Sequence, residues 1–400
     1  MTYDFDRVIE RRHTESNKWY KFGPGVLPLW VADMDFPSPE PVVRALRERV
    51  EHGIYGYIAE QPEFYEVMTE RLWKRFRWRV APEAIILQPG VIPSFNMVAR
   101  AVAQPGDGIL MQVPVYPPIL RCPGNIGLTR DEAPLARGRD GRYEIDWDAF
   151  ARAIHPRTRM FLLCNPHNPV GRVFHHVELE RMAELCLRHG LVICADEIHG
   201  DLVFAGQQHV PIATLGPEVE ARTITMMAPS KTFNLAGLKA SVAIIPDRAL
   251  RERFIAARVD MVHGVNVFGY TALVAAYRDG QEWLDALLPY LEANRDFLAE
   301  SVRARLPGVQ MAPPEGTYLA WLDCREALPG EDPFTFFLEK ARVAFNDGKT
   351  FGPGGEGFVR LNFGCPRPLL VEGLERMSQA LDEARASRPP LIASAASTEA

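Results

Sequence analysis

Short apolar runs alternate with longer amphipathic stretches through the middle of this 400-residue chain. Six short runs read as buried strands because almost every position in them is apolar; they are residues 84–88, 108–113, 160–164, 191–195, 223–227 and 240–245. Between several of them the apolar positions recur at a helical spacing, as in residues 175–190, which end on a glycine. Apolar strands that alternate with helices predict an α/β fold, with a mostly parallel sheet flanked by helices on both faces.

The pattern changes towards the C-terminus. Residues 316–324 and 357–364 alternate like half-exposed strands, and residues 333–345 and 368–386 are typical of helices. This predicts a second, smaller α+β unit. We therefore expect four parts: an N-terminal arm over residues 1–45, a large α/β domain over 46–285, a small C-terminal domain over 286–386, and a mobile tail over 387–400, which shows no periodicity.

Composition narrows the class of protein. The net charge is −6 and the 45 basic residues are interspersed with acidic ones, so we expect no nucleic-acid partner. The polar N-terminus lacks a signal-peptide core, and no apolar run has the length of a membrane span. The six cysteines show neither a CxxC pair nor metal-ligand spacing. These features predict a cytoplasmic protein that has no membrane segment and no metal site.

Candidate chemistry lies just after the predicted strands, where doubly wound sheets bind their ligands. Gly90 stands at a turn before a helix, and the backbone N–H groups there suit an anion. Tyr116 follows the second run, Asn168 the third and Asp196 the fourth. Taken alone, each is as well explained by an ordinary structural role. Gly90 can form a turn, Tyr116 can be a structural tyrosine, Asn168 can belong to a loop, and Asp196 can be a buried, hydrogen-bonded carboxylate. Together they would meet at one edge of the sheet.

A lysine completes the set. Lysine is rare in this chain, yet Lys231 and Lys239 lie among small and apolar residues, which indicates that an amine is needed there rather than a positive charge. Lys231 follows the fifth run directly after Pro229 and Ser230. This set matches the needs of pyridoxal 5′-phosphate. The anion site suits its phosphate, the aromatic plate its ring, the amide its phenolic oxygen, the buried carboxylate its ring nitrogen and the amine its aldehyde.

The same stretches carry a resemblance to a known family that covers roughly residues 15–385. The chain resembles the fold-type I pyridoxal phosphate enzymes of the class I/II aminotransferase superfamily, in particular the cystathionine β-lyase branch of MalY/PatB type. Six motifs in order carry the resemblance: PLWVADMDFPSP, NPHNPVGRVF, ADEIHGDLVF, SKTFNLAGLK, GTYLAWLD and FVRLNFGCPR.

The resemblance implies a role for each candidate in holding the cofactor. It places the Schiff base on Lys231, the ring-nitrogen partner at Asp196, the partner of the phenolic oxygen at Asn168 and the stacking ring at Tyr116. The phosphate contacts that it implies come from Gly90, Val91, Ile92 and Ser230.

Three positions depart from the wider superfamily. His199 stands where many aminotransferases have a tyrosine on the phenolic oxygen, and a histidine there fits the lyase branch. Lys239 occupies a position often held by a phosphate-binding arginine, and is expected to serve that role or an accessory one. Ala228 replaces a common serine and so removes one phosphate contact.

The resemblance also implies how an amino-acid substrate is held. Arg360 matches the arginine that clamps the α-carboxylate, with Asn168 beside it, and the region of Ala32 matches a loop that closes over the substrate. Tyr57 matches a tyrosine that crosses from the partner subunit, which implies a homodimer with shared active sites.

The residues leave the reaction open between two fates. In both, Lys231 removes the Cα proton as a general base; the product then either loses a thiolate from Cβ or continues to transamination. The branch resemblance favours carbon–sulfur β-elimination of cystathionine or another cysteine S-conjugate, with Tyr57 and Tyr116 as candidate acids for the leaving sulfur. A third alternative, a non-enzymatic regulator, would need an N-terminal DNA-binding domain that about thirty residues are not expected to house.

Overall fold

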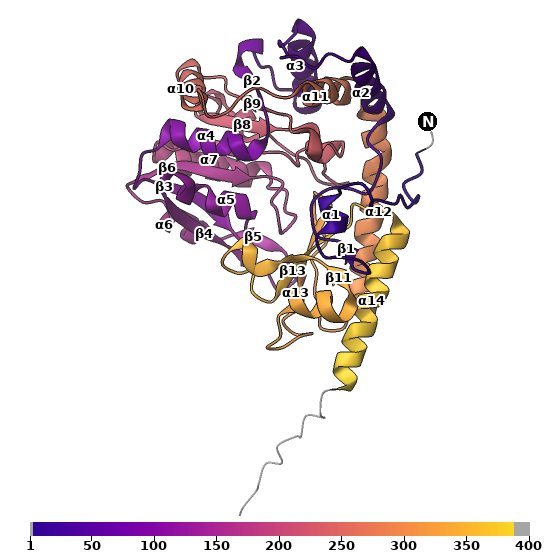
Figure 1. The fold of residues 1–400 in the computed structure, drawn as a ribbon. Helices are drawn as coiled ribbons and strands as arrows, with labels where there is room; N and C mark the ends of the chain where they lie inside the picture. Colours follow the sequence, from indigo (N-terminus) through magenta and orange to yellow (C-terminus); the bar gives the residue numbers. More distant parts are fainter. Residues whose placement is uncertain (1–2, 388–400) are drawn as a thin grey trace, which may run out of the picture.

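The computed structural model describes residues 3–387 and has an eight-stranded sheet at its centre (Figure 1). The strand order is β2-β9-β8-β7-β6-β3-β4-β5. Five neighbours, β8-β7-β6-β3-β4, are parallel, and antiparallel strands flank them at both edges. The predicted α/β fold with a mostly parallel sheet is therefore confirmed. The strands are β2 Ile85–Gln88, β3 Gly108–Val113, β4 Thr129–Arg137, β5 Tyr143–Ile145, β6 Thr158–Cys164, β7 Val192–Asp196, β8 Thr223–Met227 and β9 Ser241–Ile244.

Successive side chains of each central strand point to opposite faces of the sheet and build two separate cores. On β6, Met160 and Leu162 pack into the core that is covered by α4 (Val91–Val102) and α10 (Arg248–Arg258). Phe161 and Leu163 of the same strand pack into the other core, beneath α6 (Trp147–Arg152) and α7 (His176–Arg188). Because both faces are covered, the strands are apolar throughout, which explains why the sequence showed them so clearly.

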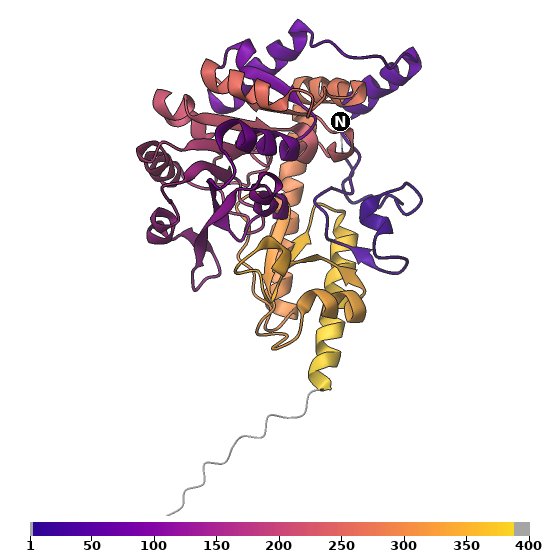
Figure 2. The same ribbon diagram turned by 60° about the vertical axis from the view of Figure 1, so that its left-hand side comes forward.

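A third core lies beside the β2–β9 edge and continues into the C-terminal part of the chain. Leu87 and Val242 of the sheet edge share it with residues of the surrounding helices. These helices are α2 Glu40–His52, α3 Pro62–Phe76, α11 Val267–Asp279 and α12 Gln281–Arg305. Figures 1 and 2 show α12 running from this region down to the smaller sheet, beside α14. The expected boundary between residues 285 and 286 falls within this continuous helix.

The smaller sheet has β13 at its centre, antiparallel to a strand on either side. Its strands are β10 Leu319–Asp323, β12 Asn346–Asp347 and β13 Phe358–Asn362. A two-stranded parallel sheet joins β1 (Leu27–Pro28) of the N-terminal arm to β11 (Val343–Ala344). The remaining helices are α1 Asn17–Tyr20, α5 Pro117–Arg121, α8 Pro217–Glu220, α9 Pro229–Thr232, α13 Pro333–Phe336 and α14 Arg367–Ala386.

Two expectations for this region were wrong. Every residue of β10 and β13 is buried, because Leu319 and Leu361 pack on the helical side while Trp321 and Phe358 pack against the large sheet's core. The helix expected over residues 333–345 ends at Ala341 in a π-helical turn, and β11 follows it. The predicted mobile tail lies outside the described residues except for Ser387.

A buried charged cluster links residues 11–19 of the N-terminal arm to Asp35 in the same arm. Lys18 is fully buried, and its Nζ lies 2.6 Å from Oδ2 of Asp35. Arg11 and the indole N–H of Trp19 donate to Oδ1 of the same carboxylate, at 2.5 and 2.9 Å. The arm is held against the smaller sheet by other bonds, because Nδ2 of Asn362 on β13 donates to the carbonyls of Val31 and Asp33 at 2.6 and 2.7 Å.

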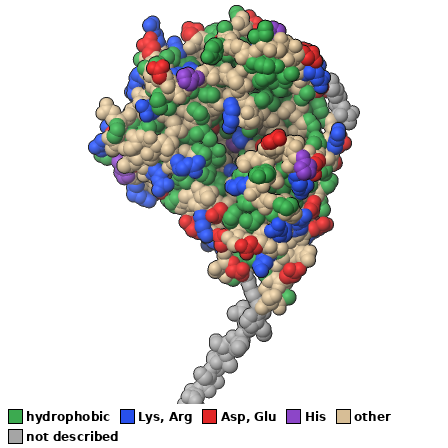
Figure 3. All heavy atoms as spheres, in the orientation of Figure 1, with side chains coloured by type: hydrophobic (Ala, Val, Ile, Leu, Met, Phe, Trp, Pro, Cys, Tyr) green, Lys and Arg blue, Asp and Glu red, His purple; other side chains and the backbone are tan. Residues whose placement is uncertain are grey.

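The visible surface in Figure 3 is hollowed near its middle, and charged side chains of both signs are interspersed around it. Among residues 3–387, none of the helices is long and apolar enough to cross a bilayer. In the same part of the chain, no group of three His, Cys, Asp or Glu side chains is placed to hold a metal ion.

Candidate active site

The carboxyl ends of the central strands meet at one edge of the sheet and open into a cavity of about 260 Å³. β2 runs parallel to β8 because both are antiparallel to β9, so the turn after β2 reaches the same edge. The structure brings together there almost every residue that the sequence nominated: Ala32, Gly90, Val91, Ile92, Tyr116, Asn168, Asp196, His199, Ser230, Lys231 and Lys239.

The turn after β2 presents a helix N-terminus to this cavity. Gly90 precedes α4, and the first backbone N–H groups of that 12-residue helix belong to Val91 and Ile92. The next residue is a proline and has no N–H, and Ser94 already donates to the carbonyl of Gly90 at 3.2 Å. Two N–H groups and the positive end of the helix dipole therefore remain for an anion. Ser230 and the exposed Lys239 border the same space.

Lys231 extends into the cavity from α9, which follows β8. Its Nζ donates to the backbone carbonyl of Ala32 at 2.6 Å, and it forms no ion pair with any carboxylate in the described part of the chain. Burial, helped by the positive charge of Arg360, lowers the pKa of Lys231 to about 8. The amine is thus held near a cleft with its basicity reduced, which favours nucleophilic and proton-transfer chemistry.

Asp196 is the last residue of β7 and is 4% exposed. Burial raises the pKa of Asp196 to about 7, although the N–H of Ile198 donates to Oδ1 at 3.2 Å. A carboxylate in this position lacks a close cation, and a protonated ring nitrogen would supply one. This fits the ring-nitrogen role that the sequence predicted for Asp196.

Tyr116 and His199 lie in the same space with their polar atoms available. Burial raises the pKa of Tyr116, so its phenol keeps its proton. Burial lowers the pKa of His199 well below its ordinary value, so the imidazole is neutral. Nδ1 of His199 is buried and has no hydrogen-bond partner in residues 3–387, while the ring packs edge-on against Tyr318. Nδ1 of His199 and the hydroxyl of Tyr116 are therefore suited to hydrogen bonds with the polar groups around the ring of an aromatic cofactor.

Arg360 lies on β13, behind Asn168 as seen from the cavity, and is 3% exposed. Its Nη1 donates to Oδ1 of Asn168 at 2.8 Å, and Nη2 donates to Oδ1 of Asn346 at 2.6 Å. Nε has no partner, and the guanidinium forms no ion pair within the described residues. Burial lowers the pKa of Arg360 to about 10. A buried cation that has only neutral oxygen partners is a site for a carboxylate.

Neither Arg360 nor Tyr57 lines the cavity, although Arg360 donates to Asn168 of its wall. Tyr57 lies on residues 53–61 between α2 and α3, a stretch without regular secondary structure, and its side chain is fully exposed. The prediction for Tyr57 concerned the partner subunit's site, which a single chain does not test.

The sequence did not predict two side chains that hold the segment around Ala32 in place. The hydroxyl of Tyr318 donates to the carbonyl of Ala32 at 3.1 Å. The amide of Asn234 accepts from the N–H of Met34 and donates to the carbonyls of Met34 and Phe36, each at 2.9 Å. Both lie in motifs quoted for the family resemblance, and that was the one available signal, because their partners are about 200 or more residues away.

Comparison with known proteins agrees with this geometry. The model of the family "aminotransferase class I and II" matches residues 24–377. The chain is 41% identical over 386 residues to cystathionine β-lyase PatB of Bacillus subtilis, covering 94% of this chain and 100% of that protein. It is 31% identical to protein MalY of Escherichia coli, covering 96% of this chain and 100% of that one.

Solved structures show the same similarity. Cystalysin from Treponema denticola, which contains pyridoxal 5′-phosphate, superposes with a TM-score of 0.92 at 33% identity and covers 96% of this chain and 100% of its own. The pyridoxal phosphate-bound C–S lyase from Staphylococcus hominis superposes with a TM-score of 0.89 at 31% identity, covering 95% and 99% of the two chains.

Proposed function

Because the chain belongs to the class I and II aminotransferase family, as its sequence motifs predicted, we propose that it is a pyridoxal phosphate-dependent C–S β-lyase. Its substrate is cystathionine or another cysteine S-conjugate, and its products are a thiol, pyruvate and ammonia. One observation carries the choice of elimination: the 41% identity to cystathionine β-lyase PatB extends over the whole of that protein. The same relationship supports the enzymatic alternatives over a non-enzymatic regulator.

The residues around the cavity fit pyridoxal 5′-phosphate. The N-terminus of α4 would hold the phosphate, together with Ser230 and Lys239. Tyr116 would stack on the ring, and Asn168 and His199 would bond to the phenolic oxygen. Asp196 would keep the ring nitrogen protonated, because a buried carboxylate is stabilised by a cationic partner. When bound, the cofactor accepts the electron pair that is left when a Cα–H bond breaks.

Arg360 binds the α-carboxylate of the substrate. Asn168 holds Nη1 in place, and Nε, which has no partner in the described residues, is available to donate a hydrogen bond to a planar anion. Phe351 lies below the guanidinium, 4.9 Å away, and keeps its plane in position. An anchored carboxylate fixes the Cα–H bond relative to Lys231, and such positioning is a large contribution to catalysis.

Lys231 moves the proton. As a free amine it takes the Cα proton on Nζ, and the pKa lowered to about 8 leaves a useful fraction of free amine near neutral pH. The thiolate would leave Cβ with the Cβ–S electron pair as a Cα–Cβ double bond forms, so Arg360 and Lys231 must hold the substrate in one orientation. Tyr116 keeps its phenolic proton, so it is a candidate acid for the sulfur.

The active enzyme is a cytoplasmic homodimer with shared sites. Tyr57 and its neighbours Ile54 and Tyr55 are exposed apolar or aromatic side chains on one extended segment, at 109%, 67% and 53% exposure. In a homodimer this segment crosses to the partner's cavity, where Tyr57 contacts the phosphate. The parts along each chain are the arm (1–45), the large domain (46–285) and the small domain (286–386).

The alternative is an aminotransferase. One similarity supports this alternative: a pyridoxal phosphate-bound putative aminotransferase from Clostridium difficile superposes with a TM-score of 0.92 at 35% identity. The same residues serve both reactions, so products must decide. Cystathionine is offered with and without a keto acid, and thiol, pyruvate and new amino acid are followed. Lyase activity gives thiol and pyruvate without a keto acid. If no thiol forms from any cysteine conjugate but nitrogen passes to the keto acid, the proposal is wrong.

A further inference from the structure

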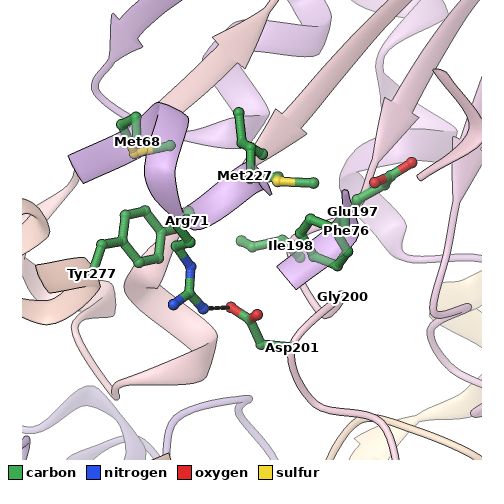
Figure 4. Close-up of a pocket in the computed structure, with 11 residues that line it drawn as sticks. Met68, Arg71, Phe76, Glu197, Ile198, Gly200, Asp201, Met227 and Tyr277 are labelled. Carbon is green, nitrogen blue, oxygen red and sulfur yellow. Dashed lines mark hydrogen bonds and ion pairs between the residues drawn. The ribbon is translucent and has the colours of Figure 1, made fainter. Parts of the chain in front are cut away.

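A closely packed charged cluster lies between α3 and the segment that follows β7 (Figure 4), and it shares Ile198 and Ala228 with the wall of the cavity. At its centre is Asp201, 8% exposed. Nη2 of Arg71 donates to Oδ2 of Asp201 at 2.6 Å, and Nε of Arg75 lies 3.3 Å from Oδ1. The free space that these side chains enclose is about 10 Å³, which is room for about one water molecule. The ion pair is therefore tightly confined.

The carboxylate of Asp201 is ionised at neutral pH. Burial acts to raise the pKa of Asp201, but the charges of Arg71 and Arg75 outweigh it and hold the pKa below its ordinary value. The ring of Tyr277 lies beside the guanidinium of Arg71, with 4.4 Å between the guanidinium carbon and the ring centre. A fixed, charged acceptor makes stronger and more directional hydrogen bonds than a neutral one.

This acceptor is linked to the helix that carries the reacting amine. Oγ1 of Thr232, the residue after Lys231, donates to Oδ2 of Asp201 at 3.0 Å. Thr232 is fully buried, so the bond is shielded from bulk solvent. The following residue, Phe233, packs 5.7 Å from the guanidinium of Arg71. The two residues after Lys231 therefore both contact the cluster.

The same carboxylate belongs to the segment that carries the cofactor-facing residues. Asp201 follows Asp196 by five positions and His199 by two. The helix α9 has only 4 residues and cannot hold its own orientation. We infer that Asp201 is a positioning residue: through its hydrogen bond with Thr232 it fixes the amine of Lys231 relative to the cofactor site. The inference rests on the proposed function in taking Lys231 as the reacting amine.

The chain offers a matched pair of variants for the test. Thr232→Val removes one buried hydroxyl and leaves the ion pair intact. Thr223→Val is the control, because Thr223 is also fully buried and its Oγ1 donates to the carbonyl of Val219 at 2.7 Å. Thr223 begins β8 whereas Thr232 follows its end, so each variant loses one buried hydroxyl bond, and only the bond of Thr232 goes to the carboxylate of Asp201.

Three readouts on holoenzyme and apoprotein separate positioning from stability. We expect Thr232→Val to lower kcat about tenfold with KM unchanged, as for the loss of one hydrogen bond to a charged group. The pH midpoint of the bound cofactor's absorption change should shift. In the apoprotein, acetylation of Lys231 by limiting acetic anhydride, quantified by mass spectrometry, should change its pH dependence. Thr232→Ser should restore all three, and Thr223→Val should lower Tm alone.

The opposite result is equally clear. If the two valine variants lose similar Tm and neither changes kcat, the absorption midpoint or the acetylation profile, the bond only stabilises the fold and the inference is wrong. Asp201→Asn provides a second variant, expected to change the same readouts and to lower Tm further. Failure of the wild-type protein to take up pyridoxal phosphate would overturn the proposed function instead, and the acetylation profile would still report on how Lys231 is held.

Discussion

Two lysines sit in low-exposure positions in this molecule, and their surroundings differ in kind. Lys18 of the N-terminal arm is fully buried and pairs with Asp35 at 2.6 Å, in a cluster that also contains Arg11. Lys231, at the edge of the large sheet, has the carbonyl of Ala32 at 2.6 Å as its only hydrogen-bond partner within residues 3–387. The first amine has a carboxylate partner, whereas burial disfavours the charge of the second.

The arginines repeat this contrast. Arg71 is paired with Asp201 at 2.6 Å, whereas Arg360 has amide and carbonyl oxygens as its only polar partners in the described chain. Paired ions fix structure, since their mutual attraction offsets the loss of hydration. Buried cations without a carboxylate partner mark places where a ligand completes the site. In this molecule, we expect the buried cations that have a carboxylate partner to stabilise the fold, and those that have none to bind a ligand.

The largest effect is expected at the paired lysine. Lys18→Met leaves the carboxylate of Asp35 buried with one of its cations removed, so we expect the free energy of unfolding to fall by about 3–5 kcal/mol. Chemical denaturation of the apoprotein measures this. Lys21→Met is a matched control, because Lys21 lies on the same arm but is exposed and packs over the rings of Phe22 and Trp30. A loss at Lys18 no larger than that at Lys21 would show that the cluster is not an anchor.

The unpaired lysine should behave in the opposite way. In the apoprotein, Lys231→Met should raise the free energy of unfolding by up to about 3 kcal/mol at neutral pH, because the native pKa of about 8 lies below the unfolded value of 10.5. The charges that face this amine are Arg360, Asp33, Asp196 and Lys239.

The pH dependence of this gain follows from linkage. Between pH 8 and 10.5 the unfolded protein binds more protons at Lys231 than the native protein does, so the wild type gains stability as the pH rises. The advantage of Lys231→Met is therefore full below pH 8 and disappears towards pH 10.5. Denaturation curves at several pH values measure the difference. A variant that is less stable than the wild type at neutral pH would contradict the contrast.

A smaller effect is expected at the unpaired arginine. Arg360→Lys keeps a positive charge but loses the planar fork, so KM should rise and kcat/KM should fall by about 10- to 100-fold, as for the loss of a charged hydrogen bond. Steady-state kinetics with cystathionine measure both. Arg253→Lys serves as the control, because Arg253 lies on α10 and its guanidinium donates to the carbonyl of Ala101. An unchanged kcat/KM would remove Arg360 from substrate binding.

The smallest effect is expected at Lys239, because its side chain is exposed and exposed charges contribute about 0.2–1 kcal/mol. Lys239→Met should weaken the affinity for pyridoxal phosphate by less than about fivefold, and added salt should reduce the difference. Titration of the apoprotein with the cofactor measures this. A loss of a hundredfold or more would place Lys239 among the main phosphate contacts.

The sequence predicted the large sheet and its edge well, because both depend on local patterns. Six apolar runs match strands, and the polar residues that end or follow them, such as Asp196 and Lys231, reach one cavity. Contacts between distant segments could not be predicted. The burial of Lys18 depends on the arm folding back on Asp35, and the burial of β10 depends on Trp321 packing against the other sheet. Neither leaves a periodic signal.

One measurement tests the central claim most directly, namely that Lys231 is the amine kept free for the cofactor. The protein is loaded with pyridoxal 5′-phosphate, reduced with borohydride, digested and analysed by mass spectrometry. The account predicts one pyridoxyl group per chain, on the peptide that contains Lys231, and none on Lys18. A pyridoxyl group on Lys239 or Lys18, with Lys231 unmodified, would contradict it.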